Sequence, residues 1–585
     1  MFAVLKKLSW FFRENWQRYM IAITLLILVG ILDVMPPKLI GMAIDEIHIG
    51  IISKQKILRY LGILLLITVS SYAITYVWMY RLFGGAFLVE RKLRSRFVKH
   101  LLKMTPGFYE KNRTGDLMAR ATNDLKAISI TAGFGILTLV DSSVWMLTLL
   151  LTMGLFISWK LTLAAIIPLP LMAILMKIYG KRIHTRFMEA QDAFGELNDR
   201  VLESVAGVGV IRAFVQEVAD SNRFHQLTED VYHKNIRVAK IDALFDPTIK
   251  VLVGISYLIG LGYGAYLVFH QTITLGNLVS FNVYLGMLIW PMFAIGELIN
   301  VMQRGNASLD RVNETLNYKV EVGNPLEPVA IATADRIDYQ KATFRYPSSK
   351  NDNLKNVDVK LLQGQTLGIV GKTGSGKTTF IKQLLRQYPL GTGKVSISEV
   401  SLEEQTLNQV RNWIGYVPQD HVLFSRSVKD NILFGRTDAS DEELETAIDL
   451  AAFRKDLEML PEGLATMVGE KGVALSGGQK QRISIARALI KNPEILILDD
   501  SLSAVDAKTE KQIIDNIRLV RTDKTTIITT HRMSAIEHAD HIIVLDEGRI
   551  VEEGTHEQLI EHNGWYKEQF IRQQIAGKVD EGVSA

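Results

Sequence analysis

Long runs of apolar residues recur through the first half of the chain and stop near residue 305. A helix needs about 20 mostly apolar residues to cross a bilayer core of about 30 Å. Six runs meet this length, and the third and fourth nearly touch at residues 157–159, where we expect a hairpin. The pattern therefore predicts an α-helical bundle of six transmembrane helices, near 19–42, 57–80, 132–155, 160–180, 249–270 and 278–301.

The polar connections between these runs differ in charge. The long connections at 81–126 and 181–248 are rich in Lys and Arg, whereas residues 271–277 are uncharged. Positive charge marks the cytoplasmic side, so we expect the long connections, the N-terminus and the second half of the chain in the cytoplasm. Both long connections have helical periodicity that is interrupted near 113–124 and 203–215. By themselves these interruptions fit either turns that end one helix and begin a short docking helix or ordinary loops.

From about residue 335 onward, short apolar strand patterns alternate with helical patterns, which is typical of an α/β domain. We predict a transmembrane domain over 1–318 and a linker over 319–334. An α/β domain would follow over 335–575, with a C-terminal tail over 576–585.

Composition narrows the classes of function. Of the 585 residues, 48% are apolar and 22% are charged, which excludes a disordered or low-complexity protein. The net charge of +4 gives no argument for nucleic acid as a partner. The chain contains no cysteine, which excludes disulfides, thiolate metal sites and cysteine nucleophiles.

A phosphate-binding loop follows the predicted strand Thr366–Val370. Residues 371–378 match G-x-x-x-x-G-K-[ST], in which glycines let successive backbone N–H groups face phosphates at a helix N-terminus. Lys377 would reach the β- and γ-phosphates, and the Thr378 hydroxyl would bind Mg²⁺. The expected nucleotide-binding residues of this segment are Gly371, Thr373, Gly374, Ser375, Gly376, Lys377, Thr378 and Thr379.

An apolar strand, Ile495–Leu498, ends in two acids. Asp499 suits a Mg²⁺ ligand, and Asp500 stands where a carboxylate would polarise an attacking water molecule.

A second candidate anion site precedes the amphipathic helix 483–490. It comprises Ser476, Gly477, Gly478 and Gln479 at a predicted helix start. One nucleotide does not need two such cradles from one chain. We therefore infer that this segment completes the site of a nucleotide held by another subunit.

In this order and spacing, the three motifs resemble the nucleotide-binding domain of ATP-binding cassette (ABC) transporters. The resemblance implies that ATP and Mg²⁺ are bound and that Tyr346 stacks on adenine. It also implies that Gln419 contacts Mg²⁺ and senses the membrane domain, that His531 contacts the γ-phosphate, and that Ser503–Asp506 contacts a second cassette.

Six helices fused before one such domain resemble an exporter-type half-transporter. This resemblance implies a second half-transporter subunit as partner, and it turns the interruptions near 113–124 and 203–215 into coupling helices. It also implies ATP-driven efflux of amphipathic drugs across the bacterial plasma membrane, with membrane lipids around the bundle and no nucleic acid partner.

The chain departs from the family pattern at Asp500, where the family has a catalytic glutamate. Aspartate is one methylene shorter, which withdraws the carboxylate by about 1–1.5 Å. A displacement of about 1 Å can slow catalysis on the order of 100-fold. We expect a weak site on this chain and a heterodimer whose other site is competent. The alternative is a homodimer that tolerates aspartate.

The sequence says less about the substrate than about the nucleotide site. Asp33, Asp141 and Glu297 are ionisable residues at membrane depth, where such groups are candidates for function. Trp145 and Trp290 add aromatic surface for flat cationic compounds. Ordinary packing or interhelical hydrogen bonds would also explain these residues. Two further readings stay open, a homodimeric lipid flippase and an ATP-gated regulatory subunit.

Overall fold

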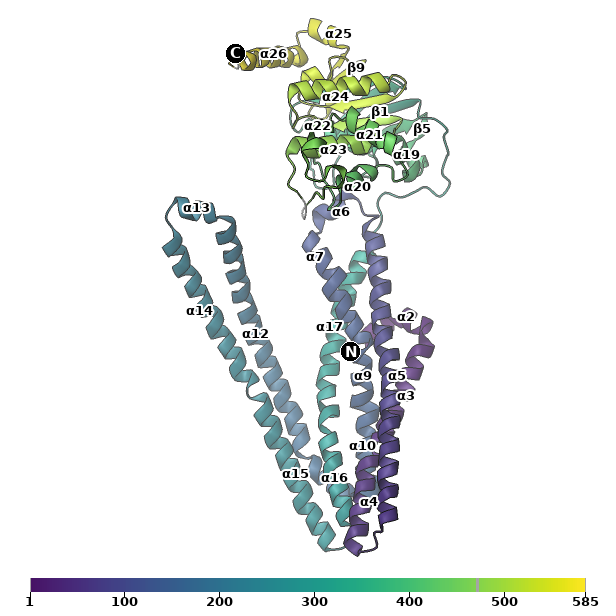
Figure 1. Ribbon diagram of the computed structural model, residues 1–585, viewed down its shortest axis with the longest axis vertical. Coiled ribbons are helices and arrows are strands. Elements are labelled where there is room, and N and C mark those ends of the chain that lie inside the picture. The colour runs from purple at the N-terminus through teal and green to yellow at the C-terminus, as the bar shows by residue number, and fades with distance from the viewer. Residues whose placement is uncertain (1, 470–472, 584–585) are drawn as a thin grey trace. The chain divides into compact units, whose positions relative to one another are not determined.

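The computed structural model describes residues 2–469 and 473–583, and the chain divides into two compact units (Figure 1). The first unit comprises Met1–Lys99 and Gly115–Asn317, and the second comprises His100–Thr114 and Tyr318–Ala585. Residues 100–114 thus belong to the second unit, although the sequence analysis placed them in the transmembrane domain. Phe108 of this segment is buried, and its ring packs edge-on against that of Tyr318, which belongs to the same unit.

The described residues of the first unit form helices joined by short turns. Five helical stretches among them are long and apolar enough to cross a membrane: Trp16–Ile49, Lys54–Leu101, Thr114–Ala206, Glu217–Phe269 and Leu275–Leu316.

The third stretch contains both of the apolar runs that we expected to form a hairpin. Its helices are interrupted at Ser158, whose backbone is extended (φ −168°, ψ 123°). The Ser158 hydroxyl accepts a hydrogen bond from the backbone N–H of Leu161 and so caps the next helix. The chain reverses direction here (Figure 1), so this one stretch contains two of the predicted spans. The five stretches therefore account for all six predicted spans.

The helices of this unit have the following bounds: α1 (Ala3–Lys7), α2 (Ser9–Glu14), α3 (Trp16–Asp33), α4 (Met35–Ile49), α5 (Lys54–Leu101), α7 (Thr114–Ala119), η1 (Arg120–Asp124), α8 (Leu125–Ala132), α9 (Phe134–Val140), η2 (Asp141–Trp145), α10 (Met146–Met153), η3 (Gly154–Ser158), α11 (Trp159–Ile166), α12 (Pro168–Ala206), α13 (Val208–Ala213), α14 (Glu217–Asp242), α15 (Phe245–Phe269), α16 (Leu275–Met287) and α17 (Ile289–Leu316).

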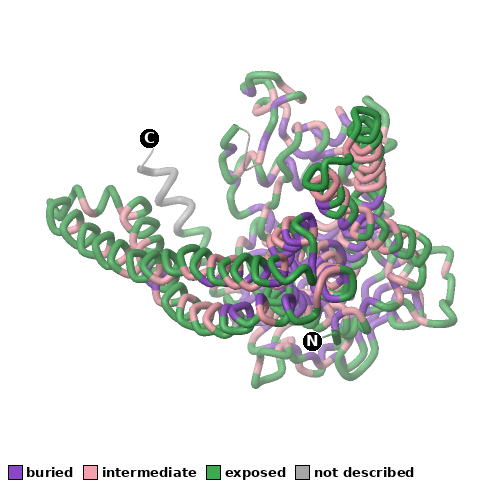
Figure 2. Tube along the Cα trace, turned by 90° about the horizontal axis from the view of Figure 1, so that it is seen from below, coloured by how far each residue is buried: buried purple, intermediate pink, exposed green. Residues whose placement is uncertain are grey.

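Helices α12 and α14 pack along each other and are joined by α13, forming an arm that diverges from α9 and α17 (Figure 1). Helices α13 and α14 contain no buried residue among those described, and the arm is exposed along much of its length (Figure 2). The expected coupling segment 203–215 contains α13. The other expected segment, 113–124, is mostly continuous helix, and the short separate helix α6 (Pro106–Lys111) lies before it. Pro106 at the first turn of α6 favours a helix start there.

The second unit contains two sheets. Its strands are β1 (Arg336–Phe344), β2 (Leu354–Leu362), β3 (Thr366–Gly371), β4 (Thr392–Ile397), β5 (Val400–Ser401), β6 (Ile414–Val417), β7 (Ile495–Asp499), β8 (Thr525–Thr529), β9 (His541–Asp546) and β10 (Arg549–Gly554). Its longer helices are α18 (Lys377–Leu384), α19 (Leu407–Trp413), α20 (Val428–Leu433), α21 (Asp441–Leu450), α22 (Arg454–Met459), α23 (Gly477–Leu489), α24 (Ala507–Val520), α25 (His556–Glu561) and α26 (Trp565–Val583). Of the expected C-terminal tail, residues 576–583 continue α26, and residues 584–585 lie outside the described part of the chain.

The larger sheet has the strand order β10-β9-β3-β8-β7-β6. From β9 to β6 neighbouring strands are parallel, and only β10 is antiparallel to its neighbour. The smaller sheet is antiparallel, in the order β2-β1-β4-β5.

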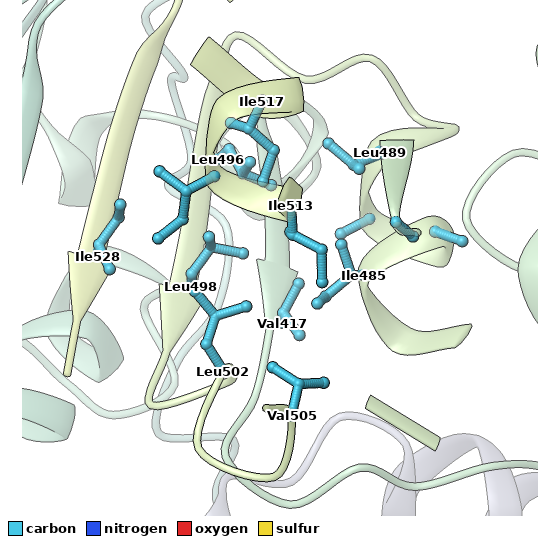
Figure 3. Packing of buried hydrophobic residues seen from close by; sticks show 14 of the residues in the cluster. Val417, Ile485, Leu489, Leu496, Leu498, Leu502, Val505, Ile513, Ile517 and Ile528 are labelled. Carbon is cyan, nitrogen blue, oxygen red and sulfur yellow. The ribbon is translucent and has the colours of Figure 1, made fainter. Parts of the chain in front are cut away.

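Helices cover both faces of the parallel strands. Leu496 and Leu498 of β7 pack with Ile513 and Ile517 of α24 on one face (Figure 3). The alternate residues of the same strand, including Ile497, join a second apolar cluster on the other face. Burial on both faces explains why these strands are continuous apolar runs.

Candidate nucleotide site

The carboxyl ends of four neighbouring parallel strands meet at one edge of the larger sheet. Strand β3 leads into the phosphate loop, β6 ends just before Gln419, β7 ends at Asp499, and β8 leads to His531. The topology thus gathers motifs that are up to 160 residues apart in sequence, from Gly371 to His531. Ligands of open α/β sheets bind at this edge.

The phosphate loop lies between β3 and α18, as the sequence predicts. Gly374 and Gly376 have left-handed φ angles of 81° and 109°, which glycine adopts without strain. A Cβ atom on Gly371 would lie 2.1 Å from the carbonyl oxygen of Leu545, so no other residue fits there. Lys377 is buried, and its Nζ donates to the carbonyl oxygens of Gly371 (2.8 Å) and Lys372 (3.1 Å).

The two residues predicted to bind Mg²⁺ are in direct contact. The hydroxyl of Thr378 donates to Oδ1 of Asp499 at 3.2 Å. Two further hydroxyls orient this buried carboxylate: Thr529 donates to Oδ1 at 2.7 Å and Tyr416 donates to Oδ2 at 3.3 Å. Sequence reasoning missed both. Thr529 could have been found from its place at the end of β8, beside His531.

Asp500 lies immediately beyond β7 with a left-handed backbone (φ 48°). Its N–H donates to the carbonyl oxygen of Thr529 at 2.9 Å, and the amide of Gln419 donates to its Oδ2 at 3.4 Å. The structure therefore places two of the three predicted catalytic residues within contact of each other. Gln419, also predicted to bind the metal, contacts Asp500 rather than Asp499.

The charges of this region influence one another. Burial raises the pKa of the Asp500 carboxyl above its ordinary value, although His531 and Lys377 oppose the shift. Burial lowers the pKa of Lys377, while the two aspartates oppose that change. Burial and the Lys377 charge lower the pKa of His531. Lys377, Asp500 and His531 thus lie close enough to sense each other's charge.

Tyr346, the predicted adenine-stacking residue, is half-buried and lies beside α18. Its hydroxyl is 3.1 Å from the hydroxyl of Thr379, and Lys382 lies over its ring. Its ring also packs edge-on against Tyr388, with centroids 5.0 Å apart. The Tyr388 hydroxyl donates to Glu110 of α6 at 2.7 Å. Tyr388, which sequence reasoning missed, therefore joins the predicted adenine side of the site to α6.

The segment around Ser476 forms a separate helix start. The Ser476 hydroxyl accepts from the N–H of Gln479, and the Gln479 side chain accepts from the N–H of Ser476, which is a reciprocal cap of α23. A Cβ on Gly478 would lie 3.1 Å from the carbonyl oxygen of Ala504. Among the described residues, no hydrogen bond joins Ser476, Gly477, Gly478 or Gln479 to the phosphate loop.

The donor set fits a magnesium nucleotide. Mg²⁺ in nucleotide sites takes one or two carboxylates and the substrate phosphates rather than a cage of protein ligands. No group of three or more His, Cys, Asp or Glu residues in the described ranges could hold a metal by itself. The Ser375 hydroxyl is buried without a hydrogen-bond partner, as expected of a loop that surrounds a phosphate.

Comparisons with known proteins agree with this geometry. Residues 19–292 match the family described as the ABC transporter transmembrane region, and residues 354–503 match the ABC transporter domain. The chain is 63% identical, over the whole length of both proteins, to the probable multidrug resistance ABC transporter ATP-binding/permease protein YheI of Bacillus subtilis. It is 42% identical to the multidrug resistance-like ATP-binding protein MdlA of Escherichia coli, covering 98% of this chain and 97% of that one.

The fold also matches a solved structure of a bacterial Atm1-family ABC exporter with ATP bound. The TM-score is 0.76 at 26% identity, covering 95% of this chain and 98% of the other.

Fold and site together define an ATP-hydrolysing, multi-pass membrane translocase that binds ATP with Mg²⁺. The chain belongs to the ABC transporter family, as an exporter half-transporter with its membrane domain fused to its nucleotide-binding domain.

Proposed function

We propose that this chain is one half of a heterodimeric multidrug exporter, most like the BmrC subunit of the bacterial exporter BmrC/BmrD. In this proposal its own phosphate-loop site hydrolyses ATP slowly. Its segment at Ser476–Gln479 completes the competent site, whose nucleotide is held by the partner. The substrates are amphipathic drugs, and the membrane is the bacterial plasma membrane.

The observation that carries the proposal is Asp500. Backbone hydrogen bonds to Thr529 fix its position at the end of β7, and its side chain ends one methylene short of the family's glutamate. Rotation of the Asp500 side chain cannot place its carboxylate where a glutamate carboxylate would lie, because the aspartate side chain is one methylene shorter. With the Mg²⁺ ligands Thr378 and Asp499 intact, such a site binds ATP but activates water poorly.

The arm built from α12, α13 and α14 supports a partner subunit. Val210, Phe214 and Val218 at its end are all exposed. Exposed apolar clusters on a membrane transporter mark contact surfaces. A second half-transporter would cover them. The basic connections at 81–126 and 181–248 support a cytoplasmic position for this end of the arm and for the nucleotide-binding domain.

A lipid flippase is the main competing function. One relative, the ATP-dependent lipid A-core flippase of Syntrophus aciditrophicus, is 30% identical over 99% of this chain and 96% of its own length. The two more similar relatives described above carry multidrug names, which favours drug export.

Two measurements test the proposal. The first is ATP turnover by the chain purified alone in lipid, compared with the complex formed with a co-purifying half-transporter. We expect negligible turnover alone and full turnover in the complex. Robust turnover by the chain purified alone would contradict the heterodimer and favour a homodimer. The second is stimulation of that turnover: drugs should stimulate it, whereas stimulation by one lipid would favour flipping, and stimulation by neither would favour a regulatory subunit.

A further inference from the structure

The C-terminal helix α26 contacts the segment that carries His531. The Nε2 atom of Gln573 donates a hydrogen bond to the carbonyl oxygen of His531 at 2.7 Å. The Oε1 atom of the same side chain accepts from the backbone N–H of Met533 at 2.9 Å. One side-chain amide therefore holds the backbone on both sides of Arg532.

The two backbone groups that Gln573 binds lie outside the sheet. Strand β8 ends at Thr529, and the 3₁₀-helix η6 (Met533–Ala535) begins two residues after His531. In the described part of the chain, no other group donates to the His531 carbonyl or accepts from the Met533 N–H. Backbone polar groups that leave a ladder need a side chain or water as partner, and here Gln573 is that side chain.

Helix α26 is fixed to the nucleotide-binding domain before it reaches this segment. Tyr566 is fully buried, and Trp565 and Phe570 pack against the same apolar cluster. Tyr566, Phe570 and Gln573 follow each other at spacings of four and three residues, which place side chains on one face of a helix. The face that anchors α26 in the core therefore also presents the Gln573 amide to the His531 segment.

A second side chain ties the same segment to another loop. Nη1 of Arg532 donates to the carbonyl oxygen of Val505 at 3.0 Å, and Nη2 donates to that of Ser503 at 3.1 Å. Both carbonyls belong to Ser503–Asp506, which the sequence predicts to contact a second cassette. Arg532 binds neither of the backbone groups that Gln573 holds, so the two side chains fix different parts of one segment.

We propose that Gln573 is a positioning residue for His531. By holding the His531 carbonyl, the amide fixes the backbone from which the imidazole extends, and so keeps the imidazole where it can meet the γ-phosphate. A misplacement of about 1 Å is enough to impair such a contact. Gln573 acts through His531 and is not itself a catalytic residue. The inference rests on the predicted contact between His531 and the γ-phosphate, and it does not require a heterodimer.

ATP and ADP separate this role from a merely structural one, because only ATP carries the γ-phosphate. The purified complex in lipid is labelled on ice with a photoreactive ATP analogue, and unlabelled ATP or ADP competes. Label on this chain, once the subunits are separated, reports its own site. We expect Gln573→Ala to weaken competition by ATP about three- to tenfold, as for one lost hydrogen bond, and to leave competition by ADP unchanged.

Gln574→Ala is the matched control. Gln574 is the next residue of α26, is exposed, and forms no side-chain hydrogen bond with the residues that the structure describes. Its replacement should change competition by neither nucleotide. An ATP-selective loss in Gln574→Ala as large as that in Gln573→Ala would overturn the proposal.

A double-mutant cycle tests whether the effect passes through His531. His531→Ala should itself weaken competition by ATP about tenfold, and Gln573→Ala should add nothing in that background. The same loss in both backgrounds, equal losses for ATP and ADP, or unchanged competition in Gln573→Ala would each overturn the proposal. Unchanged competition by ATP in His531→Ala would refute the γ-phosphate contact and this inference with it.

Turnover by the chain purified alone separates this inference from the proposed function. Robust turnover alone, together with an ATP-selective loss in Gln573→Ala, would refute the heterodimer and support the role of Gln573. Negligible turnover alone, without an ATP-selective loss in Gln573→Ala, would do the reverse.

Discussion

At the scale of single residues, the proposed nucleotide site combines the residues predicted to bind phosphate and metal with an acid that is one methylene shorter than the family's glutamate. Thr529 and Tyr416 hold Asp499 by hydrogen bonds, so the predicted metal carboxylate is firmly placed. Hydrogen bonds to Thr529 likewise hold the backbone of Asp500 in place. Asp500 differs from the family's glutamate in the length of its side chain. We propose that the position of the carboxylate, rather than the presence of an acid, decides the rate of hydrolysis.

Lengthening this side chain should restore catalysis. We predict that Asp500→Glu raises ATP turnover of the chain purified alone by on the order of 10- to 100-fold, because it returns the carboxylate by about one C–C bond length. Since this chain also supplies an intact Ser476–Gln479 segment, two copies of the variant would contain complete sites. Steady-state phosphate release measures the change, and Asp500→Asn is the control that should not gain activity. An unchanged rate in Asp500→Glu would refute the reach argument.

His531 gives the site a pH dependence. Its pKa is lowered by burial and by Lys377, so the imidazole becomes protonated at a more acidic pH than a free histidine does. Protonation adds positive charge near the expected position of the phosphates. We therefore predict that affinity for ATP increases as the pH falls through this low pKa. Titrations with ATP at pH 7.5 and 5.5 should show a smaller increase in His531→Gln than in the wild-type chain. Identical increases in both would show that other groups cause it.

Residues with a fixed order along the chain were the easiest to predict. The phosphate loop and the acids at the end of β7 follow directly from spacing and from the end of an apolar strand. Tyr388, Thr529 and Tyr416 could not be predicted with the same ease, because their roles depend on contacts between distant segments. Tyr388 meets Glu110 across 278 positions of sequence, and no local pattern encodes such a meeting.

At the scale of elements, the membrane helices show how local chemistry positions long segments. Helices α4 and α16 cross in backbone contact, since a Cβ on Gly276 would lie 1.9 Å from the carbonyl oxygen of Gly41. Asp45 reinforces the crossing by accepting from the Gly276 N–H at 2.7 Å. Small residues at such crossings let membrane helices approach closely.

A single methyl group should disturb this crossing. We predict that Gly276→Ala destabilises the chain by roughly 1–3 kcal/mol, the usual range for an overpacked contact. Thermal unfolding in detergent, followed by helix content, measures the loss. Gly296→Ala on α17 is a matched control, because nothing lies within 4 Å of the place that its added methyl group would occupy. Equal melting of the two variants would contradict the close crossing.

The sequence predicted the apolar runs well and the breaks between them less well. The turn at Ser158 was expected, since two runs met there with too little chain between them for any other connection. An interruption was expected near 113–124, but this segment is mostly helical, and the short separate helix is α6 at Pro106–Lys111; whether either segment is a coupling helix stays a prediction. The polar and glycine residues at 113–124 are compatible with a helix when neighbouring helices pack on them. The helical periodicity of this segment was therefore a better guide to its structure than its composition, which favours a break. Pro106 was the better signal, because proline at a first turn starts a helix.

At the scale of the whole molecule, the features that one chain leaves unused favour a partner. The Ser476–Gln479 helix start has no described hydrogen bond to this chain's own phosphate loop. The α12–α14 arm carries exposed apolar residues at its end. The sequence alone predicted a second subunit from the first of these features. It could not reveal the second, because exposure of an apolar residue depends on the folded arrangement.

The central claim is that the two nucleotide sites of the working complex are unequal. Vanadate trapping with a photoreactive ATP analogue tests it most directly, because only a site that hydrolyses ATP retains trapped nucleotide and becomes labelled. In the complex with its co-purifying partner, this account predicts that nearly all trapped label is carried by the partner. Equal labelling of the two subunits, or labelling of this chain alone, would contradict it.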